Sequence, residues 1–276
     1  MINCRTKKEL DMRILVTNDD GIFAPGLWVL VKELKNIAQV VVVAPDREQS
    51  AIGTAVTLHR PIRAQEVTPI VPEVETYSVE GTPTDSVILA LGQLVRNKID
   101  LVISGINRGL NLGADVFISG TVGAALQGYL RGYPALAVSA DAVNHRQLNN
   151  TAKFAALVAK RIDCGTLPAN IFLNINLPRL SLAKIRGAKI TRLASESHTN
   201  SVDERDDGTG RCYWLIRNRI NNNTNKKTDI WAIEQGNISI TPLHTNLSSK
   251  PSSPIRASLF SDLLYQLRKC YMLGIK

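Results

Sequence analysis

The residues best suited to chemistry stand where short apolar runs stop. Two neighbouring carboxylates, Asp19 and Asp20, follow the apolar run of residues 13–17 and lie between Asn18 and Gly21. Adjacent carboxylates repel each other unless a cation lies beside them, and hard divalent cations such as Mg²⁺ and Mn²⁺ prefer carboxylate oxygens. The pattern therefore predicts a divalent-cation site, although Asn, Asp and Gly are also common in a solvated turn.

Two later polar loops offer further oxygen ligands. Residues 46–50 follow the apolar run of residues 40–44, and Ser50 carries a hydroxyl that a metal accepts as a ligand. Residues 104–113 are rich in Gly and Asn, and Asn107 offers a carbonyl oxygen to a metal and an amide to a phosphate. Taken alone, each loop also fits an exposed surface connection.

A third feature suits an anion. Ser119, Gly120 and Thr121 stand at the start of a helical pattern, where free backbone N–H groups and the helix dipole favour negative charge. The alternative is ordinary N-capping by a hydroxyl. The glycines of residues 105–113 match neither G-x-G-x-x-G nor a Walker A loop, so dinucleotide and triphosphate binding lack their motifs.

The elements that must position these residues alternate between strand-like and helix-like patterns. We expect strands at residues 13–17, 40–44, 55–60, 76–79, 100–104, 135–139 and 171–176, and helices at 26–35, 83–96, 121–131 and 151–162. Thr82, followed by Pro83, predicts the start of one of these helices. The alternation predicts an α/β fold with a Rossmann-like, three-layer, doubly wound and mostly parallel sheet. Ligands bind such sheets beyond the carboxyl ends of the strands, where the polar loops fall.

The pattern changes in the last third of the chain. Its expected elements are antiparallel strands at residues 212–217 and 237–241, an Asn-rich loop at 218–227 and an amphipathic helix at 257–271. We therefore divide the chain into a Rossmann-like catalytic core, residues 1–185, and a C-terminal extension, residues 186–276. The extension is expected to serve in oligomerisation.

Composition narrows the class of protein. The net charge is +9, but the basic residues are scattered and no long basic run is interleaved with aromatics, so dedicated nucleic-acid binding is not expected. No apolar stretch reaches the roughly 18 residues of a membrane-spanning helix, and the first residues lack the apolar segment of a secretory signal. The four cysteines show no metal-ligand spacing. We expect reduced thiols and a cytoplasmic protein.

Several motifs occur together in a fixed order. They are V-T-N-D-D-G at residues 16–21, A-P-D-R-x-x-S at 44–50, G-T-P-x-D at 81–85, S-G-x-N-x-G-x-N at 104–111 and S-G-T-V at 119–122. In this order they resemble the SurE family of survival-protein nucleotidases. The resemblance is strong over residues 13–139 and weaker at residues 174–178 and 240–244. It implies a Rossmann-like sheet, a homodimer or homotetramer, and release of phosphate from nucleoside monophosphates.

The resemblance also implies roles for single residues. The family's metal ligands, two aspartates, a serine and an asparagine, match Asp19, Asp20, Ser50 and Asn107 here, and we assign catalytic roles to Asp19, Asp20 and Asn107. The implied substrate and phosphate contacts are Asn18, Asn111, Ser119, Gly120 and Thr121. Two positions, Thr54 and Ile118, depart from the residues that many members carry.

The sequence therefore predicts a metal-dependent phosphatase, a 5′-nucleotidase that hydrolyses nucleoside 5′-monophosphates with one Mg²⁺ or Mn²⁺ per subunit. Nucleoside 3′-monophosphates and short polyphosphate are further candidate substrates, and the preferred base stays open. One alternative is a non-catalytic nucleotide-binding regulatory module, but a pure phosphate binder gains nothing from two adjacent aspartates without a metal. Another is an esterase on the same sheet, against which the absence of a G-x-S-x-G motif argues.

Overall fold

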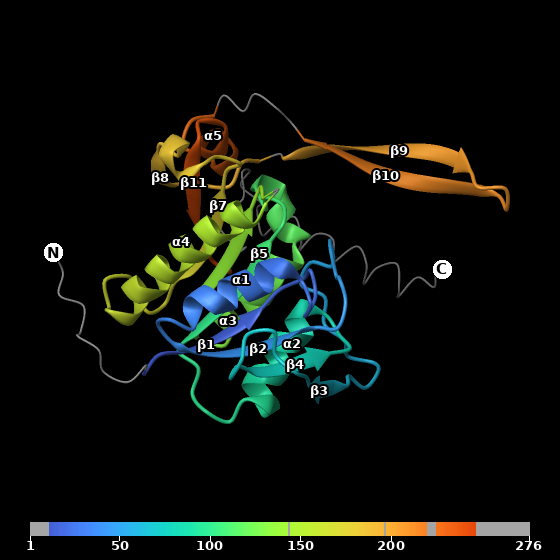
Figure 1. Ribbon diagram of the computed structural model, residues 1–276. Coiled ribbons are helices and arrows are strands. Elements are labelled where there is room, and N and C mark those ends of the chain that lie inside the picture. The colour runs from blue at the N-terminus through green and yellow to red at the C-terminus, as the bar shows by residue number, and fades with distance from the viewer. Residues whose placement is uncertain (1–10, 143, 196, 220–224, 247–276) are drawn as a thin grey trace, which may run out of the picture. The chain divides into compact units, whose positions relative to one another are not determined.

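The computed structural model describes residues 11–142, 144–195, 197–219 and 225–246 (Figure 1). The chain divides into two compact units, residues 1–243 and 244–276. Of the second unit, only residues 244–246 are among the described ones.

A mostly parallel sheet forms the centre of the first unit (Figure 1). Among the described residues its strands are β1 (Arg13–Thr17), β2 (Gln39–Pro45), β3 (Ala64–Glu66), β4 (Glu75–Val79), β5 (Leu101–Asn107), β6 (Ala135–Ala140), β7 (Phe172–Leu177), β8 (Gly187–Ile190) and β11 (Asn237–Pro242). Their spatial order is β3-β4-β2-β1-β5-β6-β7-β11-β8. The strands from β4 to β7 pair in parallel, while β3 and β11 run antiparallel to β4 and β7.

Helices cover both faces of this sheet. They are α1 (Pro25–Leu34), α2 (Pro83–Leu89) with the π-helical turn Ala90–Leu94, α3 (Gly120–Leu130), α4 (His145–Asp163) and α5 (Asp229–Glu234). Helices α1 and α4 pack together over one face, and α2 and α3 over the other (Figure 1). Neighbouring residues of β1 belong to different core clusters: Ile14 lies in the cluster that contains Leu27 of α1, and Leu15 in the cluster that contains Val87 of α2. Because both faces are covered, the inner strands are mostly apolar, and their buried polar residues include Ser104, Ser139 and Asn176. The expected doubly wound α/β fold is confirmed.

Helix α2 begins where its sequence predicts, directly after Thr82. The Thr82 hydroxyl accepts a hydrogen bond from the Asp85 backbone at 3.0 Å, and the Asp85 carboxylate accepts one from the Thr82 backbone at 2.9 Å. This reciprocal capping box satisfies two backbone N–H groups that a helix start leaves unpaired. Pro83 occupies the first turn, where it needs no N–H partner.

The strand expected at residues 55–60 is wrong, because this segment is a loop. Its backbone is held by a side chain instead of a neighbouring strand. Thr57 donates its backbone N–H and its hydroxyl to the Asp85 carboxylate, at 2.9 and 2.7 Å. The aspartate of the G-T-P-x-D motif thus ties this loop to the start of α2.

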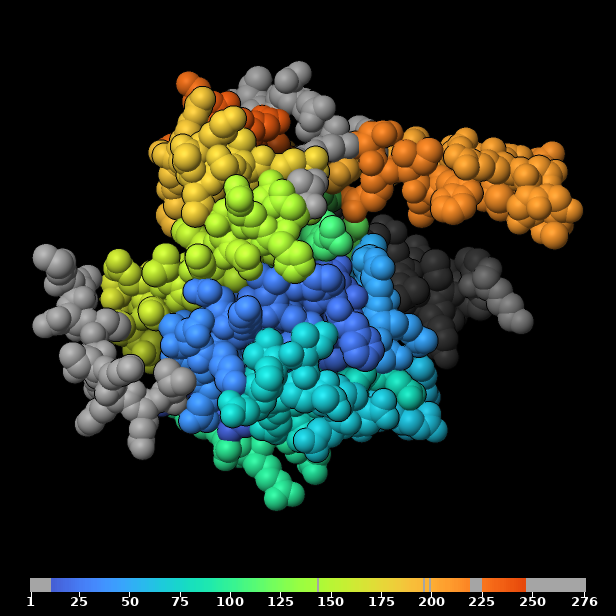
Figure 2. Space-filling view, viewed as in Figure 1, coloured from blue at the N-terminus to red at the C-terminus, as the bar shows by residue number. Residues whose placement is uncertain are grey.

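Part of the expected extension, residues 186–276, joins the main sheet. Strands β8 and β11 belong to the main sheet, and the first unit extends to Leu243. Strands β9 (His198–Asp206) and β10 (Arg211–Arg219) form a separate antiparallel ribbon, which agrees with the strand expected at residues 212–217 (Figure 1). The atoms of this ribbon are the orange ones at the right of the space-filling view (Figure 2). The expected helix at 257–271 lies outside the described residues, as does part of the expected loop at 218–227.

Across the described chain, none of the helices combines the length and the apolar character needed to cross a bilayer. Cys212 is a free thiol, as expected. Cys164 is disulfide-bonded, so the expectation of reduced cysteines is wrong for that residue.

Candidate active site

The site forms where three parallel strands end side by side. Strand β1 lies between β2 and β5, with Val16 opposite Val42 on one side and Thr17 opposite Ser104 on the other. Parallel strands in register present their carboxyl ends at one edge, so the loops that follow all three must meet there. The expectation that the polar motifs share one edge of the sheet is confirmed.

Close backbone contacts join the first two loops. The Gln49 N–H donates to the Asp19 carbonyl at 2.7 Å. Gly21 has φ +97°, and a Cβ there would lie 3.0 Å from the Arg47 carbonyl carbon. Only glycine adopts that backbone conformation at little cost. The glycine of N-D-D-G therefore lets the two acidic loops lie against each other.

Asp19 lies against the N-terminus of α3. Its carboxylate is buried and accepts a short hydrogen bond from the Thr121 hydroxyl. A Cβ on Gly120 would lie 2.8 Å from the Asp19 Cβ, so no larger residue fits between the helix and the carboxylate. Burial raises the pKa of Asp19, and the Thr121 hydroxyl and backbone amide oppose that rise. A helix N-terminus thus holds one carboxylate of the pair.

Asp20 is half-buried and lacks a full set of partners. Burial, followed by the charge of Asp19, raises the pKa of Asp20 to about 6, and a hydrogen bond from the Arg108 backbone opposes this. Its Oδ2 atom is buried without a hydrogen-bond partner among the described residues, and so is Oδ1 of Asn18. Buried polar atoms are almost always paired. An unpaired carboxylate oxygen on Asp20 and an unpaired amide oxygen on Asn18, both next to Asp19 in the chain, fit a divalent cation.

The other two expected ligands lie in the converging loops but make local hydrogen bonds. Ser50 is exposed and donates to Glu48 Oε1 at 2.6 Å. Asn107 Nδ2 donates to the Gly109 carbonyl at 2.8 Å. The described residues contain no group of three or more His, Cys, Asp or Glu that could hold a metal. The expected ligand set does not require one, because it combines two carboxylates with a hydroxyl and an amide.

The expected phosphate-side residues fall into two groups. Ser119 caps α3, since its hydroxyl accepts from the Val122 N–H at 3.1 Å, and with Gly120 and Thr121 it borders Asp19. Asn111 is instead held in a buried network. Its Nδ2 donates to the Ser139 hydroxyl at 2.8 Å, and its backbone N–H donates to Asn176 at 2.9 Å.

The comparisons with known proteins agree with this geometry. A family model described as "Survival protein SurE" matches residues 14–200. The chain belongs to the SurE family. A protein of Dehalococcoides mccartyi (strain CBDB1), named "5'-nucleotidase SurE", is 51% identical over 261 residues, which cover 94% of this chain and 98% of the relative.

Two less similar SurE proteins also match over most of this chain. A protein of the same name from Moorella thermoacetica is 45% identical over 239 residues, 86% of this chain and 92% of the relative. The crystal structure of the SurE protein from Aquifex aeolicus matches with a TM-score of 0.73 at 34% identity, covering 92% of this chain and 99% of that one. The SurE match thus extends over both the central sheet and most of the C-terminal region.

Thr54 and Ile118, the two positions that depart from the SurE pattern, lie close together. The Gly53 N–H donates to the Ile118 carbonyl at 2.8 Å, which places the loop that carries Thr54 against the residue that precedes S-G-T. A Cβ on Gly123 of α3 would lie 3.2 Å from the Thr54 Cα. Both departures therefore border the N-terminal turn of α3.

A polar cluster around Asp115, on the loop between β5 and α3, was not predicted from the sequence. The buried Asp115 carboxylate binds Ser197, His198 and Arg217, which lie near or within the β9–β10 ribbon. The sequence separations exceed 80 residues, and none of these residues stands in one of the motifs. No local pattern could have brought them together.

Proposed function

We propose that this chain is a divalent-metal-dependent phosphatase, a 5′-nucleotidase that converts nucleoside 5′-monophosphates into nucleoside and phosphate. The observation that carries the proposal is the adjacent pair Asp19 and Asp20, one held by the N-terminus of α3 and the other with an unpaired buried oxygen. The names of the relatives from Dehalococcoides mccartyi and Moorella thermoacetica support the reaction class.

One Mg²⁺ or Mn²⁺ per subunit would be held by Asp19, Asp20, Ser50 and Asn107. Asn107 uses its amide nitrogen for Gly109, and its carbonyl oxygen is the atom a hard cation prefers. Ser50 is exposed, so its hydroxyl can turn from Glu48 at little cost. The cation, when bound, would supply positive charge to the phosphate and favour the ionisation of water.

The phosphate would lie at the N-terminus of α3, where Ser119, Gly120 and Thr121 stand, and the expected contacts of Asn18 and Asn111 would come from the loops that follow β1 and β5. A helix N-terminus suits an anion because its first N–H groups have no partner within the helix. Thr121 gives its hydroxyl and its amide to Asp19, so its main part is to set the position of that carboxylate. Asn111 fixes the loop through Ser139.

In the reaction, a water oxygen would attack phosphorus in line with the ester oxygen that leaves as the nucleoside hydroxyl. One proton of the water passes to a carboxylate, and the leaving ester oxygen takes up a proton from solvent to become the nucleoside hydroxyl. Asp20 is better placed than Asp19 to accept the proton, because Asp20 Oδ2 has no partner among the described residues while Asp19 is engaged by Thr121.

The extension of residues 186–276 would serve a homodimer or homotetramer. The β9–β10 ribbon exposes Val202, Tyr213, Trp214 and Leu215, and apolar side chains gathered on an exposed ribbon are typical of an interaction surface. Activity on 3′-monophosphates and short polyphosphate, and a cytoplasmic location, stay predictions. Nucleic acid is not an expected partner.

Phosphate release tests the function. Purified protein with Mn²⁺ or Mg²⁺ should release phosphate from nucleoside 5′-monophosphates, excess EDTA should abolish the release, and added metal should restore it. The same assay with nucleoside 3′-monophosphates compares the rates of hydrolysis of 5′ and 3′ phosphates. Folded protein that releases no phosphate with either metal would contradict the proposal and favour the non-catalytic nucleotide-binding module.

A further inference from the structure

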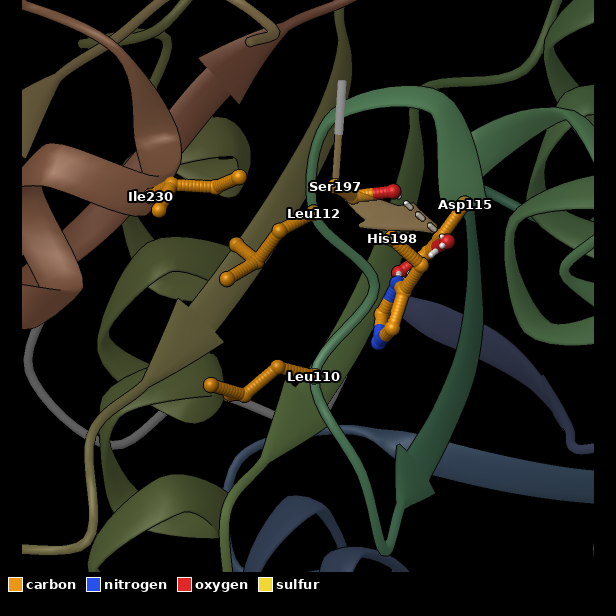
Figure 3. Close-up of a pocket in the computed structure, with 6 residues that line it drawn as sticks. All are labelled: Leu110, Leu112, Asp115, Ser197, His198 and Ile230. Atoms are coloured by element: carbon orange, nitrogen blue, oxygen red, sulfur yellow. Dashed lines mark hydrogen bonds and ion pairs between the residues drawn. The ribbon is translucent and has the colours of Figure 1, made fainter. Parts of the chain in front are cut away.

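A cavity of about 140 Å³ opens beside the loop between β5 and α3 (Figure 3). Its walls are Leu110, Leu112, Asp115, Ser197, His198 and Ile230. Figure 3 shows an apolar side made by the two leucines and Ile230, facing a polar side made by the other three residues. An apolar cavity of about 150 Å³ admits one benzene ring, so this cavity has room for one aromatic ring.

The polar side is fixed by a buried carboxylate. Asp115 accepts from the Ser197 hydroxyl at 2.8 Å and from Arg217, and His198 Nδ1 lies 3.0 Å from Asp115 Oδ2. A carboxylate accepts hydrogen bonds, so Nδ1 of His198 is the nitrogen that donates to Asp115, and Nε2 is the nitrogen left to accept a hydrogen bond when only Nδ1 carries a proton. Nε2 has no hydrogen bond within the described part of the chain, and the far edge of the ring points away from Asp115 (Figure 3).

The cavity shares one chain segment with the candidate active site. Leu110 and Leu112 flank Asn111, which is anchored to β6 and β7. The Asp115 carbonyl accepts from the Ser119 N–H at 3.0 Å, so Asp115 stands one turn before the cap of α3. That helix start contacts Asp19 at Gly120. The cavity and the start of α3 are thus connected through Asp115, which lines the cavity and bonds Ser119.

Apolar walls with a few fixed polar groups are typical of sites for flat, mostly apolar ligands that carry a hydrogen-bonding edge. The Asp115 carboxylate disfavours a second anion here. We propose that this cavity is the subsite for the heterocyclic base of the nucleotide, with His198 Nε2 accepting a hydrogen bond from an amino or ring N–H group of the base. The proposal rests on the proposed phosphatase function and adds a base-recognition site to it.

The test compares substrates with and without a base. His198→Ala should lower kcat/KM for nucleoside 5′-monophosphates that carry such a donor by about tenfold, the effect of one hydrogen bond. The same variant should leave kcat/KM for ribose 5-phosphate within about twofold of the wild type. Leu110→Trp, which places a bulky ring at a half-buried cavity wall, should also lower nucleotide turnover and spare ribose 5-phosphate.

Arg211→Gln is the matched control, because Arg211 is an exposed arginine of β10 that pairs with Glu204 and does not line the cavity. It should leave the ratio of the two substrates unchanged. Equal losses on both substrates in His198→Ala and Leu110→Trp, or unchanged nucleotide turnover in both, would overturn the base subsite.

Failure of the phosphatase itself is a separate outcome. If the wild type releases phosphate from no substrate, calorimetric titration with nucleosides decides the subsite. Binding that is lost in His198→Ala supports the subsite, and no binding to the wild type overturns it.

Discussion

Replacing Asp20 by Asn is expected to lower phosphate release from nucleoside 5′-monophosphates by about 10³-fold, because metal-ion catalysis contributes several kcal/mol and each 1.36 kcal/mol is about tenfold in rate. The substitution removes the charge that the second carboxylate offers to a cation and the acceptor for a proton. Steady-state phosphate release at saturating Mn²⁺ measures the effect. Asp203→Asn, on an exposed carboxylate of β9, is the matched control and should keep full activity. If Asp20→Asn releases phosphate at the wild-type rate, Asp20 is neither a metal ligand nor the proton acceptor.

The same variant should remain folded. The pKa of Asp20 rises from 3.8 to about 6 on folding, mainly through burial and then through Asp19. The folded state therefore binds the proton more tightly than the unfolded state, and without metal the stability falls as pH rises from 3.8 to about 6. Asp20→Asn carries no charge to bury. In EDTA above neutral pH, the Tm of Asp20→Asn should equal or exceed that of the wild type. A clearly lower Tm would contradict the claim that the charges of Asp19 and Asp20 destabilise the metal-free protein.

Gly26→Ala is expected to cause a large loss of stability. A Cβ at Gly26 in α1 would lie 2.2 Å from the Ile106 carbonyl oxygen in β5, and the central strand cannot move away. Overpacking of this kind costs about 3 kcal/mol. For a protein of this size that corresponds to a fall in Tm of roughly 6–12 °C, measurable by thermal denaturation.

The control is Gly92→Ala, where a Cβ meets nothing within 4 Å. Alanine is the better helix former by about 1 kcal/mol, so Gly92→Ala should keep or raise the Tm. If Gly26→Ala melts with the wild type, α1 does not pack on β5 as closely as the structure has it.

The position of the acidic motif could be predicted from the sequence because it depends on local pattern. The apolar runs before Asn18 and before Asp46 are long enough to mark strands covered on both faces, and parallel pairing then aligns their ends. The strand predicted at residues 55–60 was wrong because the composition of this segment does not reveal which group its backbone bonds. That partner is the Asp85 carboxylate, which replaces a neighbouring strand.

The C-terminal strands show a second limit. The alternation at residues 237–241 predicts a strand but not its neighbours, and β11 pairs with β7 and β8 inside the main sheet. The cluster around Asp115 shows a third limit, because Arg217 lies 102 residues further along the chain. A single carboxylate in a loop has no periodicity and no motif, so only the folded structure reveals what it binds.

Titration of Mn²⁺ into the metal-free protein, followed by calorimetry, tests the central claim most directly. The claim is that Asp19 and Asp20 together hold a divalent cation. The wild type should bind one Mn²⁺ per chain, and Asp20→Asn should bind it at least about 100-fold more weakly, a larger loss than removal of an outer-shell partner brings. Equal binding by the two proteins, or no binding by the wild type, would contradict the claim.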